Sequence, residues 1–242
     1  MKRPLLQAFA GFLAVCGASN AALLIDDFSV NQGPLSIFSG TSSSGIFSSG
    51  LLGGARDISL TITTPNGPNV ATAVVANGTL DFSNAVGVAS IMTVIWDGGT
   101  DSTLTPNGFV NPIDFTQAGS NDSIRLLTLG DFALNSSITL WSGNENSATW
   151  NYVLPSSATM TEVFLAFAAP TSKTVNFDIG SVTAARMVII GIANADRSID
   201  FLYADIPVGP NEVPEPMSIA LVGVGLVGFG SCLLYTSPSP RD

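Results

Sequence analysis

The chain of 242 residues contains no histidine. Histidine is the commonest general base and a usual zinc ligand, so its absence excludes imidazole-dependent catalytic triads and histidine-ligated zinc. Cysteine is nearly absent as well, because only Cys16 and Cys232 occur and each lies near a chain end. The region between them cannot form a disulfide, and its fold must therefore be stabilised by its core alone.

Charged residues are also scarce, at 11% of the chain, and most are acidic. Eight Lys and Arg residues stand against 18 Asp and Glu residues, which gives a net charge of -10. Nucleic acid is therefore excluded as an expected partner, because a polyanion would be repelled. Hydrophobic residues reach 46% and glycines number 24, a composition typical of a turn-rich β-protein with a real core.

The first residues resemble a secretory signal peptide. A basic start at residues 1–3 precedes an apolar stretch at residues 5–18, which is too short to span a membrane comfortably. Small residues follow, and we expect signal peptidase to cleave between Ala21 and Ala22. The alternatives are a buried N-terminal helix and a lipoprotein modified at Cys16, but the residue before that cysteine is branched where a lipobox needs a small one.

The other end of the chain has a different composition. Residues 207–216 are rich in proline, which disfavours helix and sheet and predicts an extended linker. Residues 217–231 are apolar, uncharged and rich in glycine, as in a transmembrane helix. The sequence therefore predicts a folded domain at residues 22–206, followed by a linker and a membrane segment.

The linker ends with Val213, Pro214, Glu215 and Pro216, directly before the apolar segment. This arrangement closely resembles the PEP-CTERM sorting signal, and the resemblance covers residues 213–231. In that family a membrane-embedded exosortase recognises the Pro-Glu-Pro tripeptide, in bacteria that make exopolysaccharide. The resemblance implies a protein that is transiently anchored in the inner membrane and then delivered to the cell surface or matrix. An ordinary tail anchor is the alternative.

The chain departs from the family pattern at its extreme end. PEP-CTERM signals finish with an Arg-rich cluster that obeys the positive-inside rule, and no such cluster is present here. Residues 232–242 instead resemble a translated sequencing adaptor. We interpret them as an artefact, so that Cys232 carries no chemistry.

The central region predicts strand after strand. Residues 58–62 alternate apolar and polar, Asn77-Gly78 predicts a tight hairpin turn, and residues 88–96 predict a central strand covered on both faces. Residues 33–54 and 100–119 are predicted loops. Further strands are predicted at residues 80–82, 124–129, 138–141, 149–154, 163–168, 187–192 and 199–204.

About ten strands and no amphipathic helix predict an all-β fold, an antiparallel two-sheet sandwich of jelly-roll type in one domain of roughly 190 residues. The opening Asp26-Asp27-Phe28 and the closing residues 199–206 are loosely similar to the terminal strands of galactose-binding-like and carbohydrate-binding jelly rolls. That similarity implies that the first and last strands lie side by side.

Three acidic residues stand at the ends of those terminal strands. If the strands pair, Asp26, Asp27 and Asp205 could gather around a structural calcium ion, which prefers hard oxygen ligands. Alternatively, they are solvated acids in turns. No other cofactor is predicted.

Trp141 and Trp150 flank the short polar segment 142–149. A hairpin would bring the two rings together across the strand pair, where exposed aromatic rings could stack on sugars. The alternative is that both belong to the core.

We therefore expect a non-enzymatic exported protein of the cell surface or exopolysaccharide matrix. The alternative is a carbohydrate-binding module for exopolysaccharide. A third hypothesis is a glycan-active enzyme, which would need a pair of carboxylates acting as acid and base, and no pair stands out.

Overall fold

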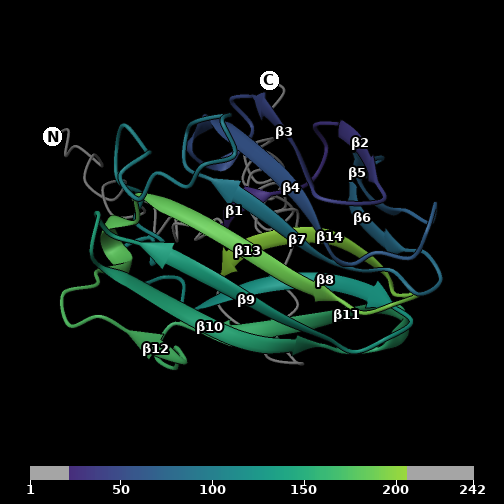
Figure 1. Cartoon of the computed structure of the whole chain (residues 1–242). Helices are drawn as coiled ribbons and strands as arrows, with labels where there is room; N and C mark the ends of the chain where they lie inside the picture. Colours follow the sequence, from purple (N-terminus) through teal and green to yellow (C-terminus); the bar gives the residue numbers. More distant parts are fainter. Residues whose placement is uncertain (1–21, 206–242) are drawn as a thin grey trace, which may run out of the picture. The chain divides into compact units, whose positions relative to one another are not determined.

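The computed structural model describes residues 22–205 (Figure 1). The predicted cleavage between Ala21 and Ala22 lies at the edge of this range, and the linker, the sorting motif and the segments after it lie outside it. The chain divides into two units, and the boundary between them in the sequence lies between Ile206 and Pro207. Within residues 22–205, no helix is long and apolar enough to cross a membrane.

Sheet A contains seven antiparallel strands in the order β11-β8-β14-β6-β5-β2, and β1 pairs with β14 beside this path. Its strands are β1 (Leu23–Asp26), β2 (Gln32–Ile37), β5 (Ala71–Ala76), β6 (Thr79–Asn84), β8 (Ser123–Gly130), β11 (Ser157–Ala166) and β14 (Asp196–Asp205).

Sheet B also contains seven antiparallel strands, in the order β12-β10-β9-β13-β7-β4-β3. Its strands are β3 (Thr41–Phe47), β4 (Ala55–Thr64), β7 (Ala89–Trp96), β9 (Leu134–Trp141), β10 (Ser147–Leu154), β12 (Ser172–Lys173) and β13 (Ala184–Gly191). The described residues thus form the predicted all-β, antiparallel two-sheet sandwich, and the arrangement is consistent with a jelly-roll-like fold.

The sequence pattern located most strands but missed strands at the edges of both sheets, namely β2, β3 and the two-residue β12. Residues 33–54, predicted as a loop, contain β2 and β3. Both lie at the edge of a sheet, where strands need no apolar alternation because one side is open. β2 carries Pro34, which is tolerated at an edge, and β3 is built mainly of Ser, Thr and Gly.

Two local predictions are confirmed. β5 and β6 form a hairpin around Asn77 and Gly78, whose φ angles of 56° and 83° suit a type I′ turn. The first and last strands pair, with Leu23 opposite Ala204. A third prediction is wrong in part: β7 is central, but its outward-facing Ala89, Ile91 and Thr93 are only half-buried, and of its outer side chains Ile95 alone is buried.

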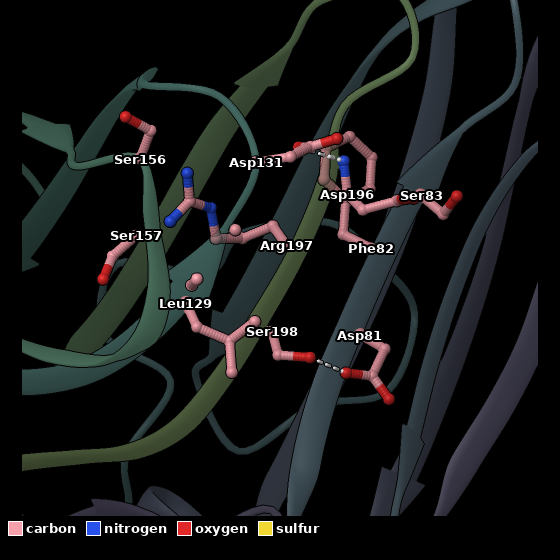
Figure 2. Close-up of a pocket in the computed structure, with 12 residues that line it drawn as sticks. Asp81, Phe82, Ser83, Leu129, Asp131, Ser156, Ser157, Asp196, Arg197 and Ser198 are labelled. Carbon is pink, nitrogen blue, oxygen red and sulfur yellow. Dashed lines mark hydrogen bonds between the residues drawn. The ribbon is translucent and has the colours of Figure 1, made fainter.

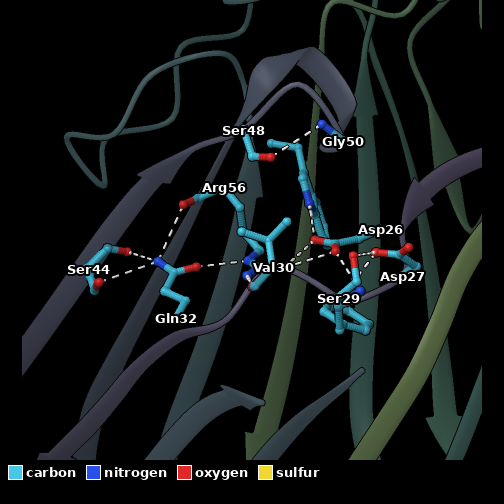
Figure 3. A network of polar contacts seen from close by, with 11 residues as sticks. Asp26, Asp27, Ser29, Val30, Gln32, Ser44, Ser48, Gly50 and Arg56 are labelled. Atoms are coloured by element: carbon cyan, nitrogen blue, oxygen red, sulfur yellow. Dashed lines mark hydrogen bonds and ion pairs between the residues drawn. The ribbon is translucent and has the colours of Figure 1, made fainter. Parts of the chain in front are cut away.

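The apolar core lies between the two sheets, and a buried ion pair crosses it (Figure 3). Asp26 of β1 and Arg56 of β4 are both 0% exposed. The Arg56 Nη1 atom lies 2.9 Å from each oxygen of the Asp26 carboxylate. The Trp96 Nε1 atom, on β7, donates to Asp26 Oδ2 at 2.9 Å. One carboxylate of sheet A is thereby bound to two strands of sheet B.

The remaining donors of Arg56 are also satisfied. Its Nε atom donates to Gln32 Oε1 at 2.8 Å, and its Nη2 atom donates to the Val30 carbonyl at 2.5 Å. Gln32 in turn donates to the Ser44 carbonyl at 2.6 Å. Complete hydrogen bonding is what makes a buried ion pair tolerable, because the cost of desolvating both charges is then offset.

Replacing Asp26 with Asn should destabilise the fold by about 3–5 kcal/mol, because Arg56 would keep a buried charge without a counterion. Urea unfolding followed by circular dichroism measures the loss. Asp27→Asn is the matched control, since the Asp27 carboxylate only accepts local hydrogen bonds from Ser29. Equal stabilities of the two variants would contradict a structural role for the ion pair.

Candidate functional site

The structure does not bring the three predicted calcium ligands together. Both oxygens of Asp26 are engaged by Arg56, while Asp27 bonds the Ser29 hydroxyl at 2.6 Å, which lowers the pKa of Asp27. The antiparallel register sets Asp26 opposite Leu202, so Asp205 lies at the other end of the ladder and contacts Arg125. In the described range, no group of three or more Asp, Glu, Cys or His side chains suited to a metal ion is found.

The two tryptophans lie on opposite faces of sheet B. Trp150 is 3% exposed, packs in the core and donates from Nε1 to the Ala166 carbonyl at 2.8 Å. Trp141 is half-buried on the outer face, with the Arg186 guanidinium 5.1 Å from its ring centre. The β9–β10 hairpin forms as expected, but its register pairs Trp150 with Ile138. The two rings therefore make no joint stacking surface.

A pocket of about 730 Å³, with several polar side chains in its lining, lies at one end of sheet A (Figure 2). We call it the end pocket. Its walls come from β6, β8, β14 and the segment that enters β11, so strands distant in sequence build it together. Its main polar side chains are Asp81, Asp131, Ser156, Ser157, Asp196 and Ser198.

Hydrogen bonds fix several of these polar groups. The Ser198 hydroxyl donates to Asp81 Oδ1, and Asp131 Oδ1 accepts from the Asp196 amide at 2.8 Å (Figure 2). The Thr79 hydroxyl also donates to Asp81, at 3.2 Å. The carboxylates are thus held by neighbouring strands, and each carboxylate has acceptor capacity beyond these bonds for the hydroxyls of a ligand.

Arg197 supports one wall of the end pocket. Its guanidinium donates to the carbonyls of Phe132 and Pro155, which belong to two different connections between strands. Only glycine fits beside the Arg197 side chain at position 130, because a Cβ atom there would lie 2.6 Å from the Arg197 Cζ atom. Burial lowers the pKa of Arg197, while nearby Asp131 opposes the shift. Arg197 therefore positions the pocket and is only 2% exposed itself.

A cluster of aromatic rings lies on the same outer face of sheet A. We call Phe164, Phe201, Tyr203 and Arg125 the aromatic patch. The Arg125 guanidinium lies 4.7 Å from the Phe164 ring centre and 5.3 Å from that of Tyr203. Phe164 is 46% exposed and Phe201 is 39% exposed. Other phenylalanines of the domain are as exposed, but here several rings gather on one face, and such a cluster marks a candidate contact surface.

Ion pairs hold the aromatic patch in place. Arg125 pairs with Glu162 and Asp205, and the Tyr203 hydroxyl donates to Glu162 at 3.0 Å. Burial and this hydrogen bond raise the pKa of Tyr203 to about 12, so its hydroxyl stays protonated at neutral pH. The Tyr203 ring and the Arg125 guanidinium are therefore held in place.

The end pocket and the aromatic patch share one strand. The side chains of residues 125, 127 and 129 of β8 all point to the outer face. Arg125 belongs to the aromatic patch, and Leu129 lines the end pocket. Four residues along a strand correspond to ~13 Å. A ligand longer than this distance could contact both features at once.

Sequence reasoning missed both features. Phe201 and Tyr203 lay within a predicted strand, but the register that places Arg125 opposite Phe164 and Tyr203 has no local signal. The pocket depends on the meeting of β6, β8, β14 and the start of β11, which is equally non-local.

No protein-family model matches the chain, and no curated protein matches its sequence. Among solved structures, the chain is similar to an agarase, with a TM-score of 0.41 and 7% identity, covering 71% of this chain and 29% of that one. It is also similar to the family 11 carbohydrate-binding module from Clostridium thermocellum in complex with a β-1,3-1,4-mixed-linked tetrasaccharide. There the TM-score is 0.37 and the identity 9%, covering 76% of this chain and 95% of that one.

A mutant of a family 29 carbohydrate-binding module is similar with a TM-score of 0.32 and 14% identity, covering 72% of this chain and 99% of that one. At these low TM-scores, the similarities assign neither a family nor a function to the chain.

The opposite positions of the two tryptophans predict different effects of their removal. Trp150→Ala should destabilise the fold by about 3–5 kcal/mol, because it leaves a cavity in the core. Trp141→Ala should cost no more than about 1 kcal/mol, since the ring lies on the outer face. Chemical denaturation of both variants tests this, and similar losses of stability would contradict the assignment of faces.

Proposed function

We propose that residues 22–205 form a carbohydrate-binding domain, with the end pocket and the aromatic patch as its binding surface. The observation that carries the proposal is the presence of exposed rings and a polar pocket on one face of one sheet. Sugars have both apolar C–H faces and many hydroxyls, so they are suited to aromatic rings and to polar acceptors together. Pockets with a few converging polar groups are the usual form of small-ligand sites.

The charge of the surface favours one class of polysaccharide. Asp81, Asp131 and Asp196 line the end pocket, and the whole chain carries a net charge of -10. A strongly acidic polymer would be repelled by this field. We therefore expect neutral, hydroxyl-rich polysaccharides to bind more tightly than polyuronates.

The proposal assigns binding and no chemical step. The rings and carboxylates stand on strands that are tied to their neighbours by hydrogen bonds and ion pairs, as in a site prepared for a ligand. Cleavage of a glycosidic bond would require a dedicated acid and base in addition.

Phe164→Ala should weaken binding of a neutral polysaccharide roughly tenfold, or about 1.4 kcal/mol, because a stacking ring is lost. The matched control is Phe47→Ala, which removes another exposed ring, on β3 of sheet B. Affinity electrophoresis of the full-length chain in gels with mixed-linkage β-glucan, agarose or polygalacturonate measures the effect. Equal retardation of both variants and the wild type, or tightest binding to polygalacturonate, would contradict the proposal.

We also propose that the chain is exported and then sorted through its C-terminal motif. The support is the sequence of the two ends, namely the signal peptide at residues 1–21 and the Pro-Glu-Pro tripeptide before the apolar segment 217–231. Signal peptidase and exosortase would act in turn, and the domain would reach the cell surface or the exopolysaccharide matrix. A surface location gives a carbohydrate-binding domain access to polysaccharide.

The sorting proposal predicts that the double variant Pro214→Ala and Pro216→Ala remains unprocessed in the membrane fraction of the native cell. Exosortase would no longer find its tripeptide, whereas the apolar segment is unchanged. The matched control is the double variant Pro207→Ala and Pro210→Ala, which alters two prolines outside the motif. Immunoblots of cell fractions test this, and normal release of the motif variant would overturn the proposal.

A further inference from the structure

An acidic side chain on the outer face of sheet B has no close hydrogen-bond partner among the described residues. Asp57 of β4 is 1% exposed, and neither of its carboxylate oxygens accepts a hydrogen bond of normal geometry, although the Ser102 amide lies near enough to affect it. It differs in this from Asp26, the other acid buried within a strand, whose oxygens are both engaged. A buried carboxylate without partners is costly, because it loses its hydration and gains nothing in exchange.

The space around this carboxylate is bounded by oxygen atoms and a glycine. Gly45 of β3 lies directly opposite Asp57 in the sheet. A Cβ atom on Gly45 would lie 2.2 Å from Asp57 Oδ1 and 2.6 Å from both the Cβ atom and the carbonyl oxygen of Thr100. Only glycine therefore fits at this position, and its missing side chain lets the Asp57 carboxylate and the Thr100 carbonyl approach the same point of β3. Both atoms are acceptors, so neither can satisfy the other.

The covering segment adds further negative charge. Residues 97–105 follow β7 and carry Asp97 and Asp101. Burial raises the pKa of Asp57 to about 6, and the charges of Asp97 and Asp101 contribute in the same direction, while the Ser102 amide opposes them. Asp97 accepts hydrogen bonds from the Gly99 and Thr105 amides, at 3.0 and 2.6 Å, and so shapes the segment.

No basic residue of the described range is paired with the Asp57 carboxylate. Arg56 precedes Asp57 in sequence, but successive side chains of a strand point to opposite faces, and Arg56 is bound to Asp26 in the core. Among residues 22–205, no ion pair of Asp57, Asp97 or Asp101 is found. A cation that takes oxygen ligands would therefore offset the negative charge of these three acids.

We propose that the space between Asp57, Gly45 and Thr100 binds a hard divalent cation of the calcium type. The Asp57 carboxylate and the Thr100 carbonyl are its protein ligands, and Asp101 strengthens the local negative field. Calcium accepts mixed sets of carboxylate, carbonyl and water oxygens in flexible geometry, so a cluster of three acids is not required. Magnesium demands a stricter octahedron and should bind less well.

The site differs from the one predicted from Asp26, Asp27 and Asp205, and it is independent of carbohydrate binding. It joins β3 and β4 to the segment 97–105. A bound ion would therefore stabilise this segment against local unfolding.

Calcium titration of the full-length chain, after removal of metal with EGTA, tests the proposal. Isothermal titration calorimetry should show one saturable calcium site per chain, and calcium should raise the midpoint of thermal unfolding. Asp57→Asn keeps the shape of the side chain and removes its charge. It should abolish both effects, and without calcium it should melt no lower than the wild type.

Two further variants keep the test decisive. Asp122→Asn, which changes an exposed acid of the other sheet, should bind calcium like the wild type. Asp101→Asn should fold normally and weaken calcium binding by about threefold or more, since it removes a nearby negative charge. The proposal is overturned if the wild type shows no saturable binding. Unchanged calcium affinity in Asp57→Asn would overturn it equally. If Asp57→Asn does not fold, unchanged calcium affinity in Asp101→Asn would overturn it.

Discussion

A fully buried ion pair fixes the position of the two sheets relative to each other. Asp26 and Arg56 lie in different sheets, and Trp96 donates to the same carboxylate, so the first strand cannot shift without breaking several bonds at once. In a domain without cysteine this pair supplies the specificity that apolar packing lacks, because apolar contacts are non-directional. The ion pair thereby also fixes the place of β1 beside β14.

The outer faces of the two sheets have different chemistry. Sheet A presents rings and a pocket of carboxylates and hydroxyls, all on strands fixed by their neighbours. Sheet B is covered in part by the segment that follows β7, with Asp57 beneath it. Surface sites on rigid strands are geometrically better defined than sites on loops. The two proposed sites therefore lie on opposite faces of the sandwich and share no residue.

The sequence predicted what depends on local pattern. Alternation located β4, and the Asn77-Gly78 dipeptide located a hairpin, because both signals lie within a few residues. It did not predict that Trp141 and Trp150 point to opposite faces, since that depends on a register in which Trp141 faces Ser147. One step of register reverses every side chain of a strand. The aromatic patch and the end pocket were missed for the same reason.

The edge strands of the two sheets affect how neighbouring molecules can pair with each other. β2 carries a proline, β12 has only two residues and β11 contains a bulge, so these margins offer a poor template for pairing with a neighbouring molecule. β1 has only four residues, and β3 is mostly Ser, Thr and Gly. These edges therefore disfavour strand pairing between neighbouring copies of the domain.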